Sequence, residues 1–270
     1  MNFIKRKTIR FAAAFLAAMC LLSGCTGADS PEKPTEKEML TIGSDIYSPY
    51  FYLDDNGDFA GIDVEIAEEA CRRLGVTPEF KQISWQNKDD CLKSGTVDCL
   101  WGSFSMNGRE DDYSWAGPYM YSRQVVVVKA ASDIRTLKDL NGKNIAVQNA
   151  SKPDELFSDD AVSEVSVKKV YSFATMSDVF AALKKEYVDA CAGHETACLE
   201  YINTINGEYR ILDEALLIAN LGVAFDRKTG TKTAAELTAV LTEMKNDGTI
   251  RKILEKYSLD IDFALKGDEK

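Results

Sequence analysis

The stretch Val97-Asp-Cys-Leu-Trp101, followed at once by Gly102-Ser-Phe-Ser-Met-Asn-Gly-Arg109, decides how this chain folds. The first part is a short apolar run that lies between two glycines, which is typical of a buried strand. The second part is small and polar, and ends in one arginine. Ligands of open α/β sheets bind just beyond the carboxyl ends of the strands. Free backbone N–H groups and a guanidinium suit a carboxylate, so the loop is either a carboxylate receptor or a surface loop whose Arg109 pairs with Glu110, Asp111 or Asp112.

Upstream of this strand, strands and helices alternate. An apolar stripe from Ile62 to Leu74 recurs at helical spacing and ends at Gly75, which predicts a helix over this range. Alternation and β-branched residues predict strands on both sides of that helix, and a short helix leads into Val97. The strands are predicted at 39–44 and 76–83, and the short helix at 87–94. This rhythm favours a parallel sheet with helices on its faces.

Downstream, the run Val125–Val128 is typical of a strand that is buried on both faces, and a second α/β set follows it. One helix starts behind Ser151, which is a plausible N-cap because Pro153 comes just inside. The other predicted elements are strands at 144–148, 166–171, 188–192, 209–212 and 221–225, and helices at 176–187, 195–205 and 237–244. After a break at Gly248, a last helix is predicted through Tyr257. If the last strand rejoins the first set, the chain forms two lobes, 39–128 plus 222–265 and 129–221. A single continuous sheet is the alternative.

The first 24 residues have the pattern of an export signal. Four basic residues precede the apolar run Phe11–Leu22, which is shorter than the roughly 20 residues of a membrane span. An uncleaved anchor is the alternative. Leu22-Ser-Gly-Cys25 resembles the bacterial lipobox, in which Cys25 would become the lipidated first residue. Residues 25–38 carry two prolines without an apolar pattern, which predicts a flexible tether. We expect a secreted protein, held by the lipid on the outer face of the cytoplasmic membrane.

Charge and cysteine content exclude other classes. The formal net charge is −11 and becomes −15 without residues 1–24, which hold four basic and no acidic residues. A chain this acidic, without a basic cluster after the signal, is not expected to bind nucleic acid. Cys20 leaves with the signal and Cys25 takes the lipid, so five cysteines remain, and a disulfide among them is possible. With one histidine and no zinc-ligand spacing, we expect no metal and no cofactor.

Six segments together resemble, in order, the solute-binding proteins of polar amino-acid ABC transporters (family 3). They are Ile42–Phe51, Gly61–Ala67, Leu92–Asp98, Arg109 with Trp115–Tyr119, Leu137–Lys143 and Leu183–Ala190. The resemblance implies the type II periplasmic-binding-protein fold, in which two α/β lobes are joined by a two-strand hinge and enclose a ligand cleft. It implies a monomeric receptor that passes a polar amino acid, or a closely related small carboxylate, to an ABC transporter permease, and it implies no enzyme activity.

The same resemblance implies a set of ligand contacts. Arg109 would bind the ligand α-carboxylate, together with backbone N–H groups of the preceding loop and of a turn at a helix N-terminus. Aromatic side chains would form the pocket, although Trp101 could equally belong to the core, and Asp45 would either contact the ligand side chain or serve as a turn residue. The residues that the resemblance implies are Asp45, Tyr47, Trp85, Trp101, Gly102, Ser103, Ser105, Met106, Asn107, Arg109, Ala150 and Ser151, with His194 and Glu195 discussed next.

The chain departs from the family at His194, where members usually have an aspartate that binds the ligand ammonium. A protonated imidazole would repel an ammonium, and a neutral one accepts a single hydrogen bond. Glu195 or Asp45 would then bind the ammonium, or the ligand lacks an α-amino group, or His194 lies outside the cleft. If His194 faces the ligand, we expect affinity to change near pH 6.5, its unperturbed pKa. A dehydratase-like enzyme with His194 and Glu195 as acid and base, or a ligand-sensing module for a membrane signalling partner, are the alternative functions.

Overall fold

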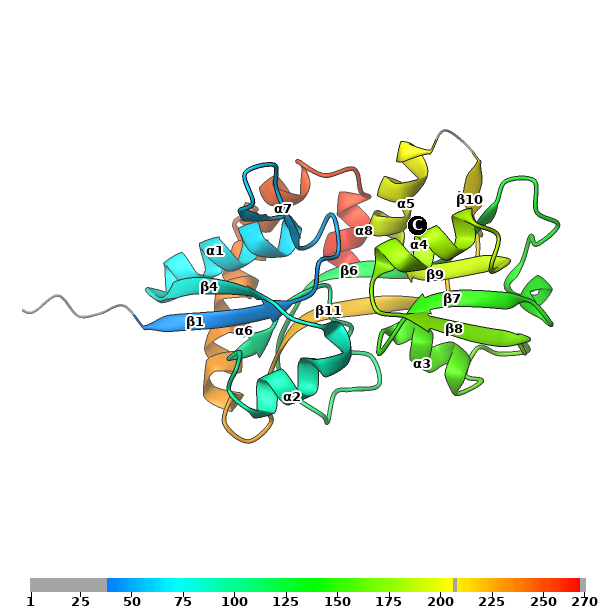
Figure 1. Cartoon of the computed structure of the whole chain (residues 1–270). Coiled ribbons are helices and arrows are strands. Elements are labelled where there is room, and N and C mark those ends of the chain that lie inside the picture. The colour runs from blue at the N-terminus through cyan, green and yellow to red at the C-terminus, as the bar shows by residue number, and fades with distance from the viewer. Residues whose placement is uncertain (1–37, 206–207, 268–270) are drawn as a thin grey trace, which may run out of the picture. The chain divides into compact units, whose positions relative to one another are not determined.

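The computed structural model describes residues 38–205 and 208–267 (Figure 1). The signal peptide predicted at 1–24, the lipidation site Cys25 and all but the last residue of the predicted tether lie outside these ranges. In the part of the chain that is described, no helix is long and apolar enough to cross a membrane. The same residues hold no group of three or more His, Cys, Asp or Glu side chains that could bind a metal ion.

The first set of strands is parallel, as predicted. β1 lies between β4 and β5 and runs parallel to both. Figure 1 shows α1 and α2 on opposite sides of β1, so helices cover both faces of this set. Gly75 closes α1 with a left-handed φ of 76°, which confirms it as the end of the helix. The elements are β1 (Met39–Ser44), the hairpin β2 (Tyr52–Leu53) and β3 (Phe59–Ala60), α1 (Ile62–Leu74), β4 (Thr77–Gln82), η1 (Trp85–Asn87), α2 (Lys88–Lys93) and β5 (Cys99–Leu100).

The second set repeats this arrangement. β7 lies between β8 and β9, again parallel to both, and α3 and α4 lie on opposite faces in Figure 1. Ser151 caps α3, because its Oγ accepts a hydrogen bond from the backbone N–H of Asp154, which confirms the predicted start of this helix. The elements are η2 (Leu137–Leu140), β7 (Asn144–Gln148), α3 (Lys152–Ser158), β8 (Lys169–Phe173), α4 (Met176–Lys184), β9 (Ala190–His194), α5 (Glu195–Thr204) and β10 (Tyr209–Ile211).

Two long antiparallel strands, β6 (Ser114–Lys129) and β11 (Leu217–Phe225), join the two sets. β11 also pairs with β5, which confirms that the last strand rejoins the first set. The order β4-β1-β5-β11-β6-β9-β7-β8, with β10 paired to β6, makes one nine-stranded sheet. The two parallel sets of strands correspond to the expected lobes. They also form one continuous sheet, because β6 and β11, which cross between them, pair with strands of both sets. The sequence predicted only the last part of β6, since residues 114–124 have no continuous apolar run and are held by pairing with β11.

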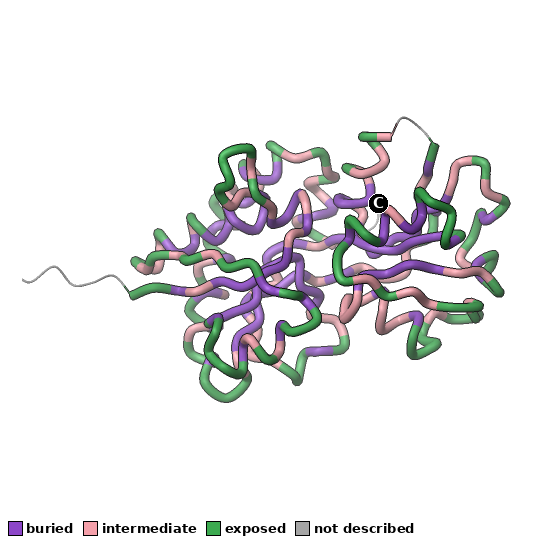
Figure 2. Tube along the Cα trace, in the orientation of Figure 1, coloured by how far each residue is buried: buried purple, intermediate pink, exposed green. Residues whose placement is uncertain are grey.

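Three helices follow β11. α6 (Thr231–Asn246) and α7 (Thr249–Leu254) pack against α1, and α8 (Ile261–Lys266) packs against β6. The sequence predicted one helix through Tyr257 after Gly248, but α7 ends at Leu254 and a separate α8 begins at the Asp260 cap, whose carboxylate accepts from the N–H of Phe263 at 3.1 Å. Figure 2 shows the strands at the centre of this arrangement as buried and the turns as exposed. The five cysteines at positions 71, 91, 99, 191 and 198 are free thiols, so none of these forms the disulfide that the sequence allowed.

Candidate functional site

A cavity of about 30 Å³ lies where the parallel strands of both sets end. Most of its lining comes from the residues that follow β1 and β5 in the first set, and from those at or just after the ends of β7 and β9 in the second, as expected for a parallel α/β sheet. Trp85 in η1, Gln124 in β6 and Met176 in α4 complete it. This volume holds about one water molecule. The structure therefore shows the two walls of the cavity in contact with each other.

Buried polar side chains gather at this cavity. Among the described residues, twelve polar or charged side chains are buried, and seven of them line it: Asp45, Ser103, Ser105, Arg109, Gln124, Gln148 and His194. Burying polar groups costs free energy unless they find hydrogen-bond partners. Seven buried polar side chains beside one cavity make this cavity the candidate site for a polar ligand.

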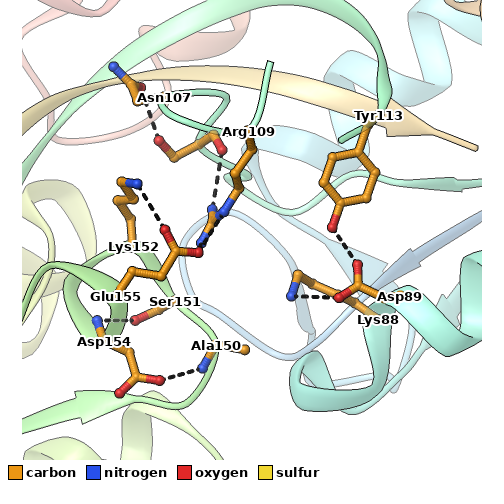
Figure 3. A network of polar contacts seen from close by, with 11 residues as sticks. Lys88, Asp89, Asn107, Arg109, Tyr113, Ala150, Ser151, Lys152, Asp154 and Glu155 are labelled. Carbon is orange, nitrogen blue, oxygen red and sulfur yellow. Dashed lines mark hydrogen bonds and ion pairs between the residues drawn. The ribbon is translucent and has the colours of Figure 1, made fainter. Parts of the chain in front are cut away.

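Arg109 lines the cavity, and Figure 3 shows its guanidinium beside Glu155. Its Nε and Nη2 both donate to Oε1 of Glu155 in α3, and its Nη1 donates to the carbonyl of Ser105 at 3.3 Å. The ring of Phe104 lies 5.1 Å from its Cζ. The alternative that Arg109 pairs with the acidic residues directly after it in the sequence is wrong, because the loop turns the guanidinium towards the second set of strands.

Two lysines make the surroundings of Arg109 rich in positive charge. Lys152 donates to Oε2 of Glu155 at 2.8 Å. Lys88, which is buried, lies over the rings of Trp85 and Phe104 and pairs with Asp89. Burial lowers the pKa of Lys88, and the negative charge of Asp89 opposes this shift. Such a cluster attracts an anion.

Asp45 forms the opposite kind of environment. It follows β1, and its Oδ2 accepts from Nε2 of Gln148, at the end of β7, at 2.5 Å. Burial raises the pKa of Asp45 to about 6, and the hydrogen bond from Gln148 lowers it only in part. Asp45 is therefore mostly ionised at neutral pH, and offers a buried carboxylate to a cationic ligand group.

His194 lines the same cavity as Asp45. Its backbone N–H donates to Oη of Tyr47 at 3.0 Å, and its ring Nε2 lies 2.9 Å from Nε2 of Gln124. Burial lowers the pKa of His194 to about 4, so the imidazole is neutral at pH 7. With this lowered pKa, any change in affinity that depends on His194 is expected nearer pH 4 than pH 6.5, and it stays a prediction.

Gln124, the neighbour of His194 in β6, is almost fully buried and its Oε1 has no hydrogen-bond partner within the described structure. An unpaired buried acceptor of this kind costs free energy, which a ligand donor would recover. Together with Asp45, it makes this end of the cavity a site for a hydrogen-bond donor.

The structure brings nine of the fourteen predicted residues to the cavity and leaves five away from it. The nine are Asp45, Tyr47, Trp85, Gly102, Ser103, Ser105, Arg109, Ser151 and His194. The five are Trp101, Met106, Asn107, Ala150 and Glu195. Each of these five has another role in the structure.

Two of the five hold the Arg109 loop against β11. The N–H of Met106 donates to the carbonyl of Asn220 at 2.8 Å, and the side chain of Asn107 accepts from the N–H of Asn220 at 2.8 Å. The amide of Met106 is therefore not free for a ligand carboxylate in this structure. A third residue, Trp101, is fully buried and packs against Tyr119 in the core, with the ring centroids 5.9 Å apart.

The turn before α3 also uses its own amides. The N–H of Ala150 donates to Oδ2 of Asp154 at 2.8 Å, and the N–H of Asp154 donates to Oγ of Ser151. Contrary to the expectation of free amides at this turn, these two groups already have partners. Glu195 pairs with Arg123 at 2.9 Å instead of joining His194 at the cavity.

Sequence reasoning missed six lining residues: Phe104, Gln124, Gln148, Lys152, Pro153 and Met176. For two of them a signal exists. Gln124 directly precedes the run Val125–Val128, and Gln148 directly follows the apolar part of β7. A polar residue at the end of a fully buried strand requires a partner, so it is a candidate for a site.

Two residues position the loop after β5. Asp63, which is buried in α1, accepts from the N–H of Ser103 at 2.6 Å and from Oη of Tyr119 at 2.7 Å, and so ties the loop to the helix and to β6. A Cβ at Gly102 would lie 1.9 Å from Oγ of Ser44, so only glycine fits where this loop leaves the sheet. The loop geometry at the cavity therefore depends on both.

Residues 40–260 match the family model of bacterial extracellular solute-binding proteins, family 3. The chain belongs to this family. Among its relatives, the L-cystine-binding protein TcyA of Bacillus subtilis is 28% identical over 93% of this chain and 97% of its own. The probable amino-acid-binding protein YxeM of the same organism is 25% identical over 94% and 95%. A solved structure of an ancestral arginine-binding protein bound to arginine has a TM-score of 0.75 and 30% identity, over 83% of this chain and 100% of that one. This family member thus has the predicted two-lobed type II fold.

Proposed function

We propose that this family member captures a free amino acid, or a closely related small carboxylate, between its lobes and delivers it to the permease of an ABC transporter. The observation that carries the proposal is the polarity of the cavity lining. Arg109 and Lys152 line the cavity, and Lys88 lies over the ring of Phe104 beside Arg109. Asp45 and Gln124, whose Oε1 has no partner within the described structure, line the same cavity. A zwitterion with a carboxylate and an ammonium matches this pattern of charge. The names of the relatives, which bind cystine, arginine or other amino acids, support the same class of ligand.

In this proposal Arg109 binds the carboxylate, and Asp45 with Gln124 takes the place of the aspartate that the family usually has at His194. Glu195 is the weaker candidate for the ammonium, because its carboxylate is held by Arg123 away from the cavity. The same separation weakens the alternative of an enzyme, since His194 and Glu195 do not meet at one reacting group. We therefore assign a receptor without catalytic activity.

The proposal includes the hinge and the anchor. The lobes comprise 39–128 plus 222–265 and 129–221, and closure brings the Arg109 and Asp45 sides against the second lobe, as in the contacts to Glu155 and Gln148. A cavity with room for one water must open before a ligand enters. A lipid on Cys25 would keep the monomeric receptor beside its transporter.

The test is a thermal-shift and titration screen of the refolded protein against the twenty amino acids, L-cystine and the related small carboxylates that lack the amino group. A ligand at a hundred times its dissociation constant stabilises the fold by about 2.7 kcal/mol, which raises the melting temperature of a chain of this size by about 5–10 °C. No rise with any of these compounds would contradict the proposal.

The assignment of Arg109 is tested by Arg109→Ala, which should weaken binding of the amino acid found in the screen by at least about 100-fold, because a charged contact to the carboxylate is lost. Arg72→Ala is the matched control, since Arg72 is exposed on α1 and pairs with Glu69. Circular dichroism should show both variants folded. If Arg109→Ala binds as tightly as Arg72→Ala, Arg109 is not a ligand contact.

A further inference from the structure

The Arg109 end of the cavity already holds a carboxylate of the protein's own. Glu155 lies in the first turn of α3, in the second set of strands, whereas Arg109 follows β5 in the first set (Figure 3). Oε1 of Glu155 accepts from two nitrogens of Arg109, and Oε2 accepts from Nζ of Lys152 at 2.8 Å. Both oxygens of this side chain therefore have cationic partners.

This carboxylate stays charged at neutral pH. Burial raises the pKa of Glu155, but the hydrogen bonds and positive charges of Lys152 and Arg109 outweigh burial, and the pKa lies below its ordinary value. Two cations and one anion leave the group with a net charge of +1. An incoming carboxylate is thus still attracted, but by half of the positive charge that Arg109 and Lys152 would offer without Glu155.

We infer that Glu155 competes with the ligand carboxylate for Arg109 and thereby sets the affinity and selectivity of the site. This inference rests on the proposed function. A ligand carboxylate either replaces Glu155 on the guanidinium or shares the guanidinium with it, and in both cases the negative charge of Glu155 opposes binding. Glu155 follows β7 and Arg109 follows β5, so the two side chains meet only where the two sets of strands come together.

The competition has a consequence for the class of ligand. Replacing one carboxylate by another on the same guanidinium changes the free energy little, because the contacts that form resemble those that break. Net affinity must then come from the rest of the ligand, above all from a donor that reaches Asp45 and Gln124. The site therefore selects amino acids over carboxylic acids of the same shape that lack the amino group.

The variant Glu155→Gln tests the inference, because it keeps the shape of the side chain and removes its charge. Isothermal titration with the amino acid found among the twenty and L-cystine should show about fivefold tighter binding than wild type, which is the size expected for a partly exposed ion pair. Glu164→Gln is the matched control. It removes a carboxylate that pairs with Lys138 at 3.3 Å on the exposed surface, and it should leave the affinity unchanged.

A second titration uses the amide derivative of the same amino acid, which lacks the carboxylate. Glu155→Gln should bind this amide no more tightly than wild type does. Unchanged or weaker binding of the amino acid by Glu155→Gln would overturn the inference, and a weaker affinity would show that Glu155 instead holds Arg109 in place for the ligand. An equal gain for the amide would overturn it too. If neither protein binds any amino acid, the proposed function fails, and the inference fails with it.

Discussion

The polar groups at the two ends of the cavity are stabilised differently, by ion pairs around Arg109 and by a change of pKa around Asp45. At the Arg109 end, charges pair with one another, since Arg109 and Lys152 share the half-exposed carboxylate of Glu155 and leave a net charge of +1. At the Asp45 end, burial changes the chemistry of the groups. The pKa of Asp45 rises to about 6 and that of His194 falls to about 4, and their partners are the neutral amides of Gln148 and Gln124.

This difference indicates that the Arg109 end suits a negatively charged ligand group and that the Asp45 end suits a positively charged one. A salt bridge can exchange one carboxylate for another, so the Arg109 end accepts an anion without leaving a buried charge alone. The Asp45 end holds a carboxylate whose ionisation is disfavoured by burial, and a cationic group would stabilise it. The two ends together therefore favour a zwitterion, and each can be tested separately.

The largest effect at the Asp45 end is expected from Asp45→Asn. Removing the negative charge should weaken binding of an amino acid by about 100-fold at pH 7.5, because the ammonium loses its charged partner. Asp55→Asn, on an exposed turn, is the matched control. Titration calorimetry measures both. If Asp45→Asn binds as tightly as Asp55→Asn, the ammonium does not lie at Asp45, and the Asp45 end is not the site of a cationic ligand group.

The same variant should alter the pH dependence. In the wild type, affinity should fall by up to about tenfold per pH unit as the pH drops below about 6, where Asp45 of the free protein takes up a proton. Folding raises this pKa from 3.8, so the folded protein holds the proton more tightly than the unfolded chain does. Ionisation of Asp45 therefore lowers the free energy of unfolding as the pH rises from 3.8 to about 6, by up to about 3 kcal/mol. Asp45→Asn should remove both effects.

A smaller effect is expected from Tyr47→Phe. The variant removes the hydroxyl oxygen that accepts from the buried N–H of His194, which leaves this donor unpaired at a cost of about 1–3 kcal/mol. The melting temperature should fall by a few degrees, about 2–4 °C for each kcal/mol. Tyr187→Phe, whose side chain is 69% exposed, should show no change. Equal melting temperatures for the two variants would mean that the contact between Tyr47 and His194 does not contribute to stability.

The smallest effect is expected from Glu195→Gln. Because Glu195 pairs with Arg123 and does not line the cavity, affinity for the ligand should stay within about twofold of the wild type, and loss of this pair should cost about 0.2–1 kcal/mol of stability. Titration and thermal unfolding measure the two quantities. A loss of affinity as large as that of Asp45→Asn would move the ammonium partner from Asp45 to Glu195.

Much of the fold could be predicted from local patterns. The helix that ends at Gly75, the cap at Ser151 and the strand at Val125–Val128 depend on residues that are neighbours in the sequence, and the structure confirms all three. The length of β6 could not be predicted, because residues 114–124 become a strand only by pairing with β11, about 100 residues later. The separate helix α8 was missed for a similar reason, since it packs on β6.

The sequence alone determined that a loop ending in Arg109 follows a buried strand, and that a histidine stands where the family has an acid. These features depend on residue type and order. Only the tertiary structure decided that Glu155 meets Arg109, that Gln148 meets Asp45, and that His194 is neutral. The physical reason is that ion pairing and desolvation depend on distance and burial, and the residues concerned lie 46 and 103 positions apart in the chain.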